Sequence, residues 1–305
     1  MKVSPRYLLI APVILLLVLG VTAYLVAGPW TQPLRAAGLL PSPELEINFI
    51  DVGNMGPNAE GLVGDAILLR SSEGKTMLID GGYANGKALA YLQANNVTHL
   101  DMVVLTHLHE DHAGGLIDVL KNIPVGQFIH SGQTIDAPDY NAFAAALQES
   151  GVPVRVVKKN DTIQLGSLTF HVLSPRKIIP DVANDNSVVL RLENGKVSFL
   201  FTGDAQSLAE QIMLDGKLNV QADILKVGHH GADSSTSAAF LEAVDPEVAI
   251  YIAGKGNMHH LPHDVTLQKL RESGAEIYGT DVSGTISLRT DGKTYEIATE
   301  YGTED

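Results

Sequence analysis

The sequence contains no cysteine among its 305 residues. This absence excludes disulfide bonds and thiolate metal ligands, so any metal ion must be held by histidine and carboxylate side chains. Basic residues are scarce, since 21 Lys and Arg stand against 35 Asp and Glu and give a formal net charge of -14. A broad basic surface for nucleic acid is therefore not expected. Low-complexity tracts and short-period repeats are also missing, and a hydrophobic content of 45% predicts a globular chain.

Long apolar runs are rare too, with one exception at the N-terminus. Residues 7–27 carry no charge and have roughly the 20-residue length that crosses a bilayer. This length favours an uncleaved single-pass anchor over a cleaved signal peptide. Lys2 and Arg6 precede the run, which favours a cytoplasmic N-terminus and an extracytoplasmic remainder. We expect a transmembrane anchor at 1–28 in the cell membrane, a proline-rich linker at 29–43 and a folded domain at 44–305.

Strand-like and helix-like segments alternate after the linker, which predicts an α/β domain. Strands are expected first within 45–79, then alternating strands and helices within 86–157, two hairpins at 162–173 and 187–202, a second alternation within 207–278, and a closing hairpin around Asp291. The spacing of Ser207 and Glu210 fits a capping box at the start of one helix.

The strongest chemical signal is the stretch "LTHLHEDHAGG", which follows an apolar strand predicted at 102–106. It places four metal-binding side chains within six residues: His107, His109, Asp111 and His112. A loop that leaves a strand end can turn such side chains toward a divalent cation. The alternative, surface histidines on a polar loop, is weaker because this pattern arises by chance about once per thousand sequences.

This stretch, preceded by "LIDGG" at 78–82 and followed by "LFTGDA" at 200–205, resembles the metallo-β-lactamase superfamily. The segments "INFIDVGNMG", "NDNSVVLRL", "LKVGHHGA" and "YGTDVSGTISLRTDG" are similar to the extracytoplasmic hydrolase domain of ComEC-type DNA-uptake proteins. The resemblance covers about residues 44–300. It implies a four-layer αββα sandwich with a metal site at one edge between the sheets, and hydrolysis by a metal-activated hydroxide.

The resemblance also implies two divalent metal ions, zinc or alternatively manganese. His107 and His109 would bind the first ion, Asp111 and His112 the second, and Asp204 would bridge the two. From the residues alone, Asp204 could equally be an ordinary turn aspartate. Asp111 and Asp204 are expected to hold the attacking hydroxide.

Three further residues are assigned on weaker grounds. His229 and His230 fit the last histidine ligand of the superfamily, and adjacent side chains at a strand end point apart, so only one should bind the ion. We favour His229 as that ligand and expect His230 to contact substrate or support the ligands. Asp80 resembles a carboxylate that orients a ligand imidazole, with a plain turn residue as the alternative.

One departure from the superfamily concerns the first ion. Many members supply a further histidine between the first motif and the bridging aspartate, whereas residues 172–228 contain none. Asn184, Asp185 or Asn186 stands in the corresponding segment. Asn is a weaker zinc ligand, which predicts a loosely held first ion or a harder ion such as manganese.

A second histidine group, His259, His260 and His263, lies in "NMHHLPH". It could clamp a substrate phosphate or, through His263, protonate a leaving group, and the alternative is a polar loop over the site.

The ComEC resemblance implies a phosphodiester substrate in DNA or a smaller nucleotide, and a DNA-uptake channel as partner. An acidic domain would need a local basic path for such a polyanion, for which the candidates are Lys158, Lys159, Arg176 and Lys177. The alternatives are a hydrolase of a small ester, lactone or lactam, and a metal-holding binding module with little turnover.

Overall fold

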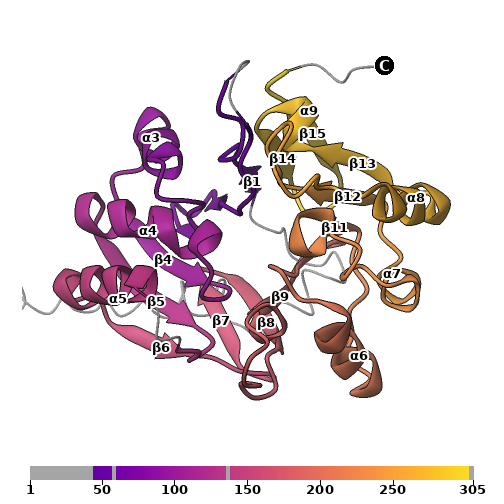
Figure 1. Ribbon diagram of the computed structural model, residues 1–305, viewed down its shortest axis with the longest axis horizontal. Coiled ribbons are helices and arrows are strands. Elements are labelled where there is room, and N and C mark those ends of the chain that lie inside the picture. The colour runs from indigo at the N-terminus through magenta and orange to yellow at the C-terminus, as the bar shows by residue number, and fades with distance from the viewer. Residues whose placement is uncertain (1–43, 57–59, 135–137, 302–305) are drawn as a thin grey trace, which may run out of the picture.

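The computed structural model describes residues 44–56, 60–134 and 138–301 (Figure 1). The anchor predicted at 1–28 and the linker predicted at 29–43 lie outside this part of the chain. Within the described ranges, no helix combines the length and the apolar character that crossing a membrane requires.

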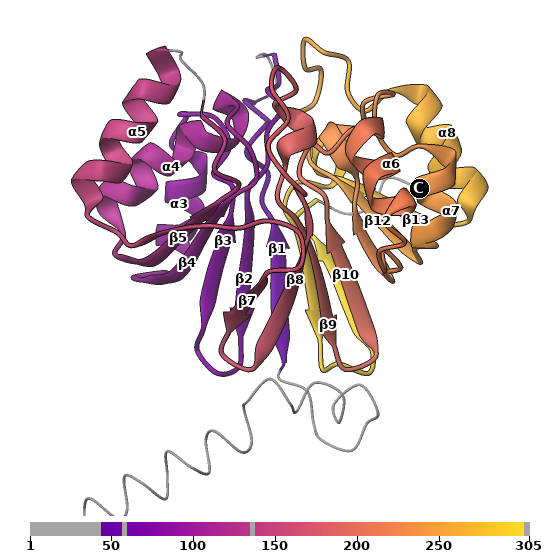
Figure 2. The ribbon, with the colours of Figure 1, turned by 90° about the horizontal axis from the view of Figure 1, so that it is seen from below.

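Two β-sheets face each other at the centre of the molecule (Figure 2). The first has the order β15-β14-β1-β2-β3-β4-β5-β6, formed by β1 (Leu45–Phe49), β2 (Ile67–Ser71), β3 (Thr76–Ile79), β4 (Leu100–Leu105), β5 (Val125–His130), β6 (Val154–Val156), β14 (Ile286–Thr290) and β15 (Tyr295–Thr299). The second has the order β13-β12-β11-β10-β9-β8-β7, formed by β7 (Thr162–Leu165), β8 (Leu168–Ser174), β9 (Val189–Asn194), β10 (Val197–Phe201), β11 (Ile224–Lys226), β12 (Val248–Tyr251) and β13 (Glu276–Gly279).

Helices cover the outer face of each sheet. The first sheet carries α3 (Lys87–Ala94), α4 (Glu110–Asn122) and α5 (Pro138–Ser150), and the second carries α6 (Ser207–Asp215), α7 (Ala238–Val244) and α8 (Asp264–Ser273) (Figure 2). Three short helical segments lie in loops: η2 (Asn184–Asn186), η3 (Gly228–Gly231) and α9 (Thr280–Ser283). The two-sheet α/β sandwich predicted from the sequence is thus confirmed.

The main core lies between the two sheets. Phe49 of β1 stacks on Phe201 of β10 with 6.5 Å between ring centroids, and Phe199 stacks on Phe201 at 6.2 Å. All three rings are fully buried. Inward-facing side chains of both sheets therefore share one interior, which fixes the sheets as facing layers and brings their edges together.

The strand directions bring the predicted site residues to one edge. β3 pairs with β4 in parallel, and β10 pairs with β11 in parallel, so the carboxyl ends of each pair lie side by side. Asp80 follows β3, His107 follows β4 after one residue, Asp204 follows β10, and His230 follows β11. In open α/β sheets, ligands bind outside the carboxyl ends of parallel strands.

Small residues let α4 approach this edge. A Cβ atom on Gly115 would lie 1.9 Å from the carbonyl oxygen of Gly81, a distance that backbone atoms cannot accept. The glycine pair that ends "HAGG" therefore lets the helix begin directly against the loop after β3, which positions its first-turn residues Asp111 and His112.

The capping box predicted at the start of α6 is wrong. Asp185 supplies the cap instead, because its carboxylate accepts hydrogen bonds from the backbone N–H groups of Gln206 (3.1 Å) and Ala209 (2.9 Å). The carboxylate of Glu210 accepts from the N–H groups of Thr236 and Ser237 and so holds the loop before α7. The correct cap is 22 residues away from Ser207 in sequence, beyond the reach of a local motif.

Candidate metal centre

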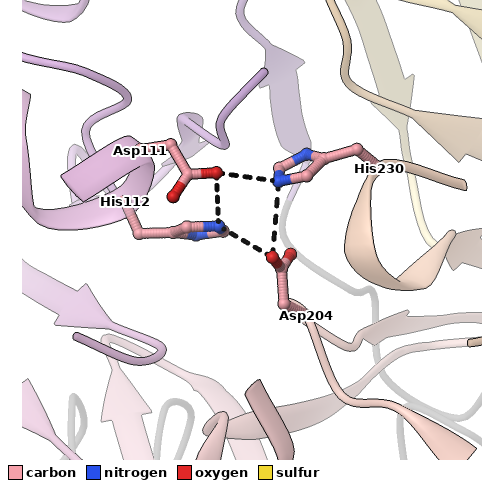
Figure 3. A group of neighbouring side chains, drawn as sticks. All are labelled: Asp111, His112, Asp204 and His230. Atoms are coloured by element: carbon pink, nitrogen blue, oxygen red, sulfur yellow. Dashed lines mark hydrogen bonds and ion pairs between the residues drawn. The ribbon is translucent and has the colours of Figure 1, made fainter. Parts of the chain in front are cut away.

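Four side chains from three separate segments converge at the sheet edge (Figure 3). Asp111 and His112 come from the first turn of α4, Asp204 from the loop after β10, and His230 from η3. Their candidate ligand atoms all lie within 4.8 Å of one another. Three of the four residues are buried, and Asp111 is half-buried.

The spacing of these atoms fits a metal ion. His112 Nε2 lies 3.2 Å from Asp204 Oδ2 and 3.6 Å from Asp111 Oδ2. His230 Nε2 lies 3.4 Å from Asp204 Oδ2 and 3.2 Å from Asp111 Oδ2. Neighbouring ligands about 2.0–2.1 Å from one ion are separated by about 3 Å, and these four distances are close to that value.

Two atoms of this group have no hydrogen-bond partner within the described residues. They are His112 Nε2 and Asp204 Oδ1, both buried. A buried polar atom without a partner is costly, and each of these lone pairs points to a cation as its partner. The group therefore fits a divalent metal ion.

The charges at the site favour a cation as well. Burial alone would lower the pKa of His112, but the negative charges of Asp204, Asp111 and Asp80 outweigh burial and raise the pKa well above its ordinary value. The pKa of His230 is raised in the same way, because Asp204 and Asp65 outweigh the effect of burial. Without a metal, the carboxylates hold protons on two imidazoles, and a metal ion would replace those protons.

Asp80 lies behind the group, where it fixes the His112 imidazole. Its Oδ2 atom is 2.8 Å from His112 Nδ1 and accepts a 2.7 Å hydrogen bond from the Thr106 hydroxyl. Its Oδ1 atom accepts from the Thr106 backbone N–H at 2.8 Å. This contact holds the proton on Nδ1 and turns the Nε2 lone pair toward the site, the supporting role expected for Asp80.

A second buried carboxylate, Asp65, was missed by sequence reasoning. Its Oδ1 atom lies 3.3 Å from Nδ1 of His230, and its Oδ2 atom forms a 2.8 Å ion pair with the ammonium of Lys226. The Lys226 ammonium also donates to the carbonyl oxygen of Val227. One signal was available, since a lysine inside the apolar strand run "ILKV" requires a buried counterion. Which carboxylate serves could not be read from the sequence.

His107 and His109 lie directly before α4, and the ring centroid of His107 is 4.2 Å from that of His112. Nε2 of His107 is 3.0 Å from Nδ1 of His109 and 3.8 Å from Asp204 Oδ2. His107 is buried, and its Nδ1 atom faces the hydroxyls of Thr106 (3.2 Å) and Ser187 (3.5 Å). Asp204 Oδ2 therefore lies within 4 Å of His107 as well as of His112 and His230, which is compatible with the bridging role expected for Asp204.

The structure corrects the choice between the adjacent histidines. The sequence favours His229 as the last histidine ligand, but His230 lies beside Asp111 and His112. The inference that the two side chains point apart is also wrong. Both residues have left-handed backbone angles, with φ of 48° and 54°, so the chain turns tightly here and does not continue as a strand. Both Nε2 atoms consequently face Asp204 Oδ2, at 3.8 Å for His229 and 3.4 Å for His230.

The segment 172–228, which lacks a histidine, places one of its three candidate side chains near the metal centre. Asn186 is committed to its own loop, because its carboxamide bonds the backbone of Ile179 and Val182. Asp185 caps α6. Of the three candidates, Asn184 alone reaches the site, with its Nδ2 atom 3.2 Å from His229 Nε2.

The second histidine group lies apart from the group of Figure 3. Nδ1 of His263 accepts a 3.1 Å hydrogen bond from the Asp233 backbone N–H, beside the loop of His229 and His230. His260 lines a different cavity, near Tyr251. The expected role of His263 as a proton donor stays a prediction.

Comparison with known proteins identifies the family. A family description of the metallo-beta-lactamase superfamily matches residues 59–255, which contain every residue of the group in Figure 3. The chain belongs to the metallo-beta-lactamase superfamily. Within this superfamily, the protein is 36% identical over 219 residues to ComE operon protein 3 of Bacillus subtilis, covering 71% of this chain and 28% of that protein. It is 31% identical over 307 residues to competence protein ComA of Neisseria gonorrhoeae, covering 94% and 40%.

The chain thus spans less than half the length of either competence-type relative. Among solved structures, the metallo-beta-lactamase fold protein YhfI of Bacillus subtilis superposes with a TM-score of 0.54 at 14% identity, over 84% of this chain and 100% of that one. This similarity confirms the superfamily fold.

Proposed function

We propose that this protein is a metal-dependent phosphodiesterase that cleaves DNA or a smaller nucleotide. The group of Asp111, His112, Asp204 and His230 carries the metal-dependent part of the proposal, since its four ligand atoms all lie within 4.8 Å of one another and the second oxygen of Asp204 is buried without a hydrogen-bond partner. The phosphodiester part is supported by the similarity to competence-type proteins over most of this chain.

Two divalent ions at this site would lower the pKa of a bound water toward neutrality and make hydroxide available for attack on phosphorus. The residues of the chain prepare the position for that chemistry. Asp204 and Asp111 place negative charge opposite the ions and orient the attacking water. Asp80 fixes the imidazole of His112, and the carbonyl oxygen of Ile252, 2.9 Å from Nδ1 of His230, fixes the imidazole of His230, with the charge of Asp65 nearby.

A basic cluster near a cavity beside the metal centre supports a phosphate-bearing substrate. The backbone N–H of Lys159 donates to the carbonyl oxygen of Pro175 at 2.8 Å, which joins the loop of Lys158 and Lys159 to the loop of Arg176 and Lys177. Arg176 and Lys177 are exposed. The chain then runs directly into the wall of a cavity of about 590 Å³ beside the metal centre, lined by residues 178–184 with His109, Gln133, Thr134 and Gln206. This basic cluster would attract a phosphate backbone despite the acidic chain.

A small ester, lactone or lactam is the second candidate substrate. The described residues that line the 590 Å³ cavity include amide and apolar side chains but neither lysine nor arginine. Such a lining suits a small neutral molecule. A metal-holding module with little turnover is less well supported, since the group of Figure 3 is complete.

We further propose that residues 7–27 anchor the protein in the cell membrane with the hydrolase domain outside the cytoplasm, beside a DNA-uptake channel. The uncharged run and the preceding Lys2 and Arg6 support the anchor. The similarity to competence protein ComA of Neisseria gonorrhoeae supports the partner. Recovery of the full chain from the soluble fraction with its native N-terminus would refute the anchor.

The purified full chain should be assayed against single-stranded DNA, a nitrophenyl phosphodiester, a lactone and a lactam, with zinc and with manganese. We expect the phosphodiesters to be cleaved. In the double variant Arg176→Ala/Lys177→Ala, KM for DNA should rise while kcat for the nitrophenyl substrate stays unchanged. Lys196→Ala/Lys293→Ala, which removes two exposed lysines in the turns before β10 and β15, serves as the charge-matched control. Turnover of the lactone or lactam with no cleavage of either phosphodiester would refute the proposed substrate class.

A further inference from the structure

His229 lies beside the group of Figure 3 but is not one of the four residues whose ligand atoms lie within 4.8 Å of one another. Its Nε2 atom lies 3.8 Å from Asp204 Oδ2, the same distance that separates His107 Nε2 from that oxygen. Two imidazoles therefore face the same carboxylate oxygen at equal range, outside the group of Figure 3.

The other ring nitrogen of His229 is firmly held. Nδ1 lies 3.1 Å from the Ser234 hydroxyl and 3.0 Å from the side-chain amide nitrogen of Gln206. The amide nitrogen of Gln206 can only donate, so Nδ1 carries the proton when the Gln206 carboxamide turns its oxygen toward the ring. Nδ1 then donates a hydrogen bond to the Ser234 hydroxyl, and a lone pair is left on Nε2. Metal-binding histidines characteristically use one nitrogen for the ion and give the other to such a partner.

The immediate surroundings of His229 Nε2 leave this position to a cation. The atom faces the carboxylate of Asp204 and the carboxamide of Asn184. Asn184 Oδ1 is buried and has no hydrogen-bond partner within the described residues. Oxygen and nitrogen of a carboxamide exchange places by a simple rotation, so Asn184 can turn an oxygen toward an ion bound there.

The left-handed turn at His229 and His230 explains how neighbours can serve different ions. Non-glycine residues rarely adopt positive φ, and two in succession are unusual. An extended chain would send the two side chains to opposite faces. The turn directs one imidazole toward Asp111 and His112 and the other toward Asn184.

We propose that His229 is a ligand of the first metal ion and replaces the histidine that the segment 172–228 lacks. The first ion would then be held by His107, His109, His229 and Asp204, and the second by Asp111, His112, His230 and Asp204. One dipeptide thus supplies an imidazole to each ion. This inference rests on the metal-dependent function proposed above, and it removes the reason to expect a weak first site.

The test counts metal ions in variants of the full chain. Glycine is the substitution of choice because it accepts the positive φ at both positions without strain. The metal-free protein is titrated with Zn²⁺ and separately with Mn²⁺ by calorimetry, and bound metal is measured by elemental analysis. The variants are His229→Gly, His230→Gly, and each of these combined with His109→Ala. His259→Gly, at an exposed histidine of the second group, is the control.

We expect two ions in the unaltered chain and the control, and one ion in His229→Gly. His109→Ala/His229→Gly should still bind one ion, because both changes affect the same site. His109→Ala/His230→Gly should bind none. His229→Asn, which also tolerates positive φ, repeats the measurement if circular dichroism shows that the glycine variant is unfolded.

Two results would overturn the assignment. One is an unchanged ion count with unchanged dissociation constants in His229→Gly. The other is the loss of both ions in His109→Ala/His229→Gly. Hydrolysis is not used as a readout, so failure of the proposed phosphodiesterase activity is distinguishable: two ions with the expected variant pattern and no cleavage would refute the activity and support the ligand assignment.

Discussion

The buried ion pair between Lys226 and Asp65 should contribute strongly to folding and to the support of His230. Both side chains are buried, and Nζ lies 2.8 Å from Oδ2. Burial would raise the pKa of Asp65, but the charges of Lys226 and His230 outweigh it and lower that pKa. Replacing Lys226 with Met keeps the apolar stem of the side chain and removes the ammonium, so a buried carboxylate loses its cation.

The expected loss is large for a single substitution. At 2.8 Å, with an effective dielectric constant of about 20, two unit charges attract by about 6 kcal/mol. Desolvation offsets part of this attraction, and removal of one partner from a buried pair costs about 3–5 kcal/mol. Lys226→Met should therefore lower the free energy of unfolding by about 3–5 kcal/mol, and Lys226→Met/Asp65→Asn should recover most of that loss because no buried charge is left unpaired.

Urea unfolding of the metal-free protein at pH 7 measures both values. Arg289→Met is the matched control, because Arg289 forms a 3.1 Å ion pair with Glu46 while its side chain is 74% exposed. Exposed pairs contribute less than about 1 kcal/mol. The reasoning would be refuted if Lys226→Met changed the unfolding free energy as little as Arg289→Met, or if the double variant were less stable than Lys226→Met alone.

Four further predictions concern the site and the helix beside it. Asp204→Ala should abolish hydrolysis and most metal binding, since it removes the oxygen that faces both sets of imidazoles; unchanged metal content by elemental analysis would show that Asp204 is an ordinary turn residue. Because the pKa values of His112 and His230 are raised without metal, zinc affinity should rise with pH as those protons are lost, and calorimetry in buffers of different ionisation enthalpy should detect proton release. The protonated imidazoles of His112 and His230 also stabilise the folded metal-free protein. This contribution is complete below about pH 6.5 and is lost as pH rises through the raised pKa values, so the metal-free protein should unfold at lower urea concentration in alkaline buffer. Gly115→Ala should destabilise the fold by more than about 3 kcal/mol, because its Cβ would meet the Gly81 carbonyl oxygen at 1.9 Å, and an unfolding free energy within 1 kcal/mol of the unaltered protein would contradict this packing.

Several features could be predicted because their signals are local. Strands and helices have hydrophobic periods of two and 3.6 residues, so their order along the chain could be read directly. The stretch from His107 to His112 carries its ligands within six residues, at the end of a strand whose apolar run is obvious. Asp80 and Asp204 follow apolar strands in the same way. Each of these inferences needed only neighbours in sequence.

The remaining ligand geometry depended on distant contacts. Asp65 lies 161 residues before Lys226, and nothing near either residue identifies the other as its partner. Asn186 was a reasonable candidate for the missing ligand until its carboxamide was found in its own loop, while Asn184 reaches the site.

By itself, the sequence determined the order of the strands and helices, the α/β class and most of the metal-binding side chains, because chain neighbours decide backbone period and strand ends. The tertiary structure alone decided that His230 joins Asp111 and His112, that His229 faces Asp204 and Asn184, and that Asp65 and Lys226 stand behind them. The physical reason is that a left-handed turn and the packing of two sheets set these directions. The side chains of two adjacent histidines can point in either direction until the two sheets have packed together.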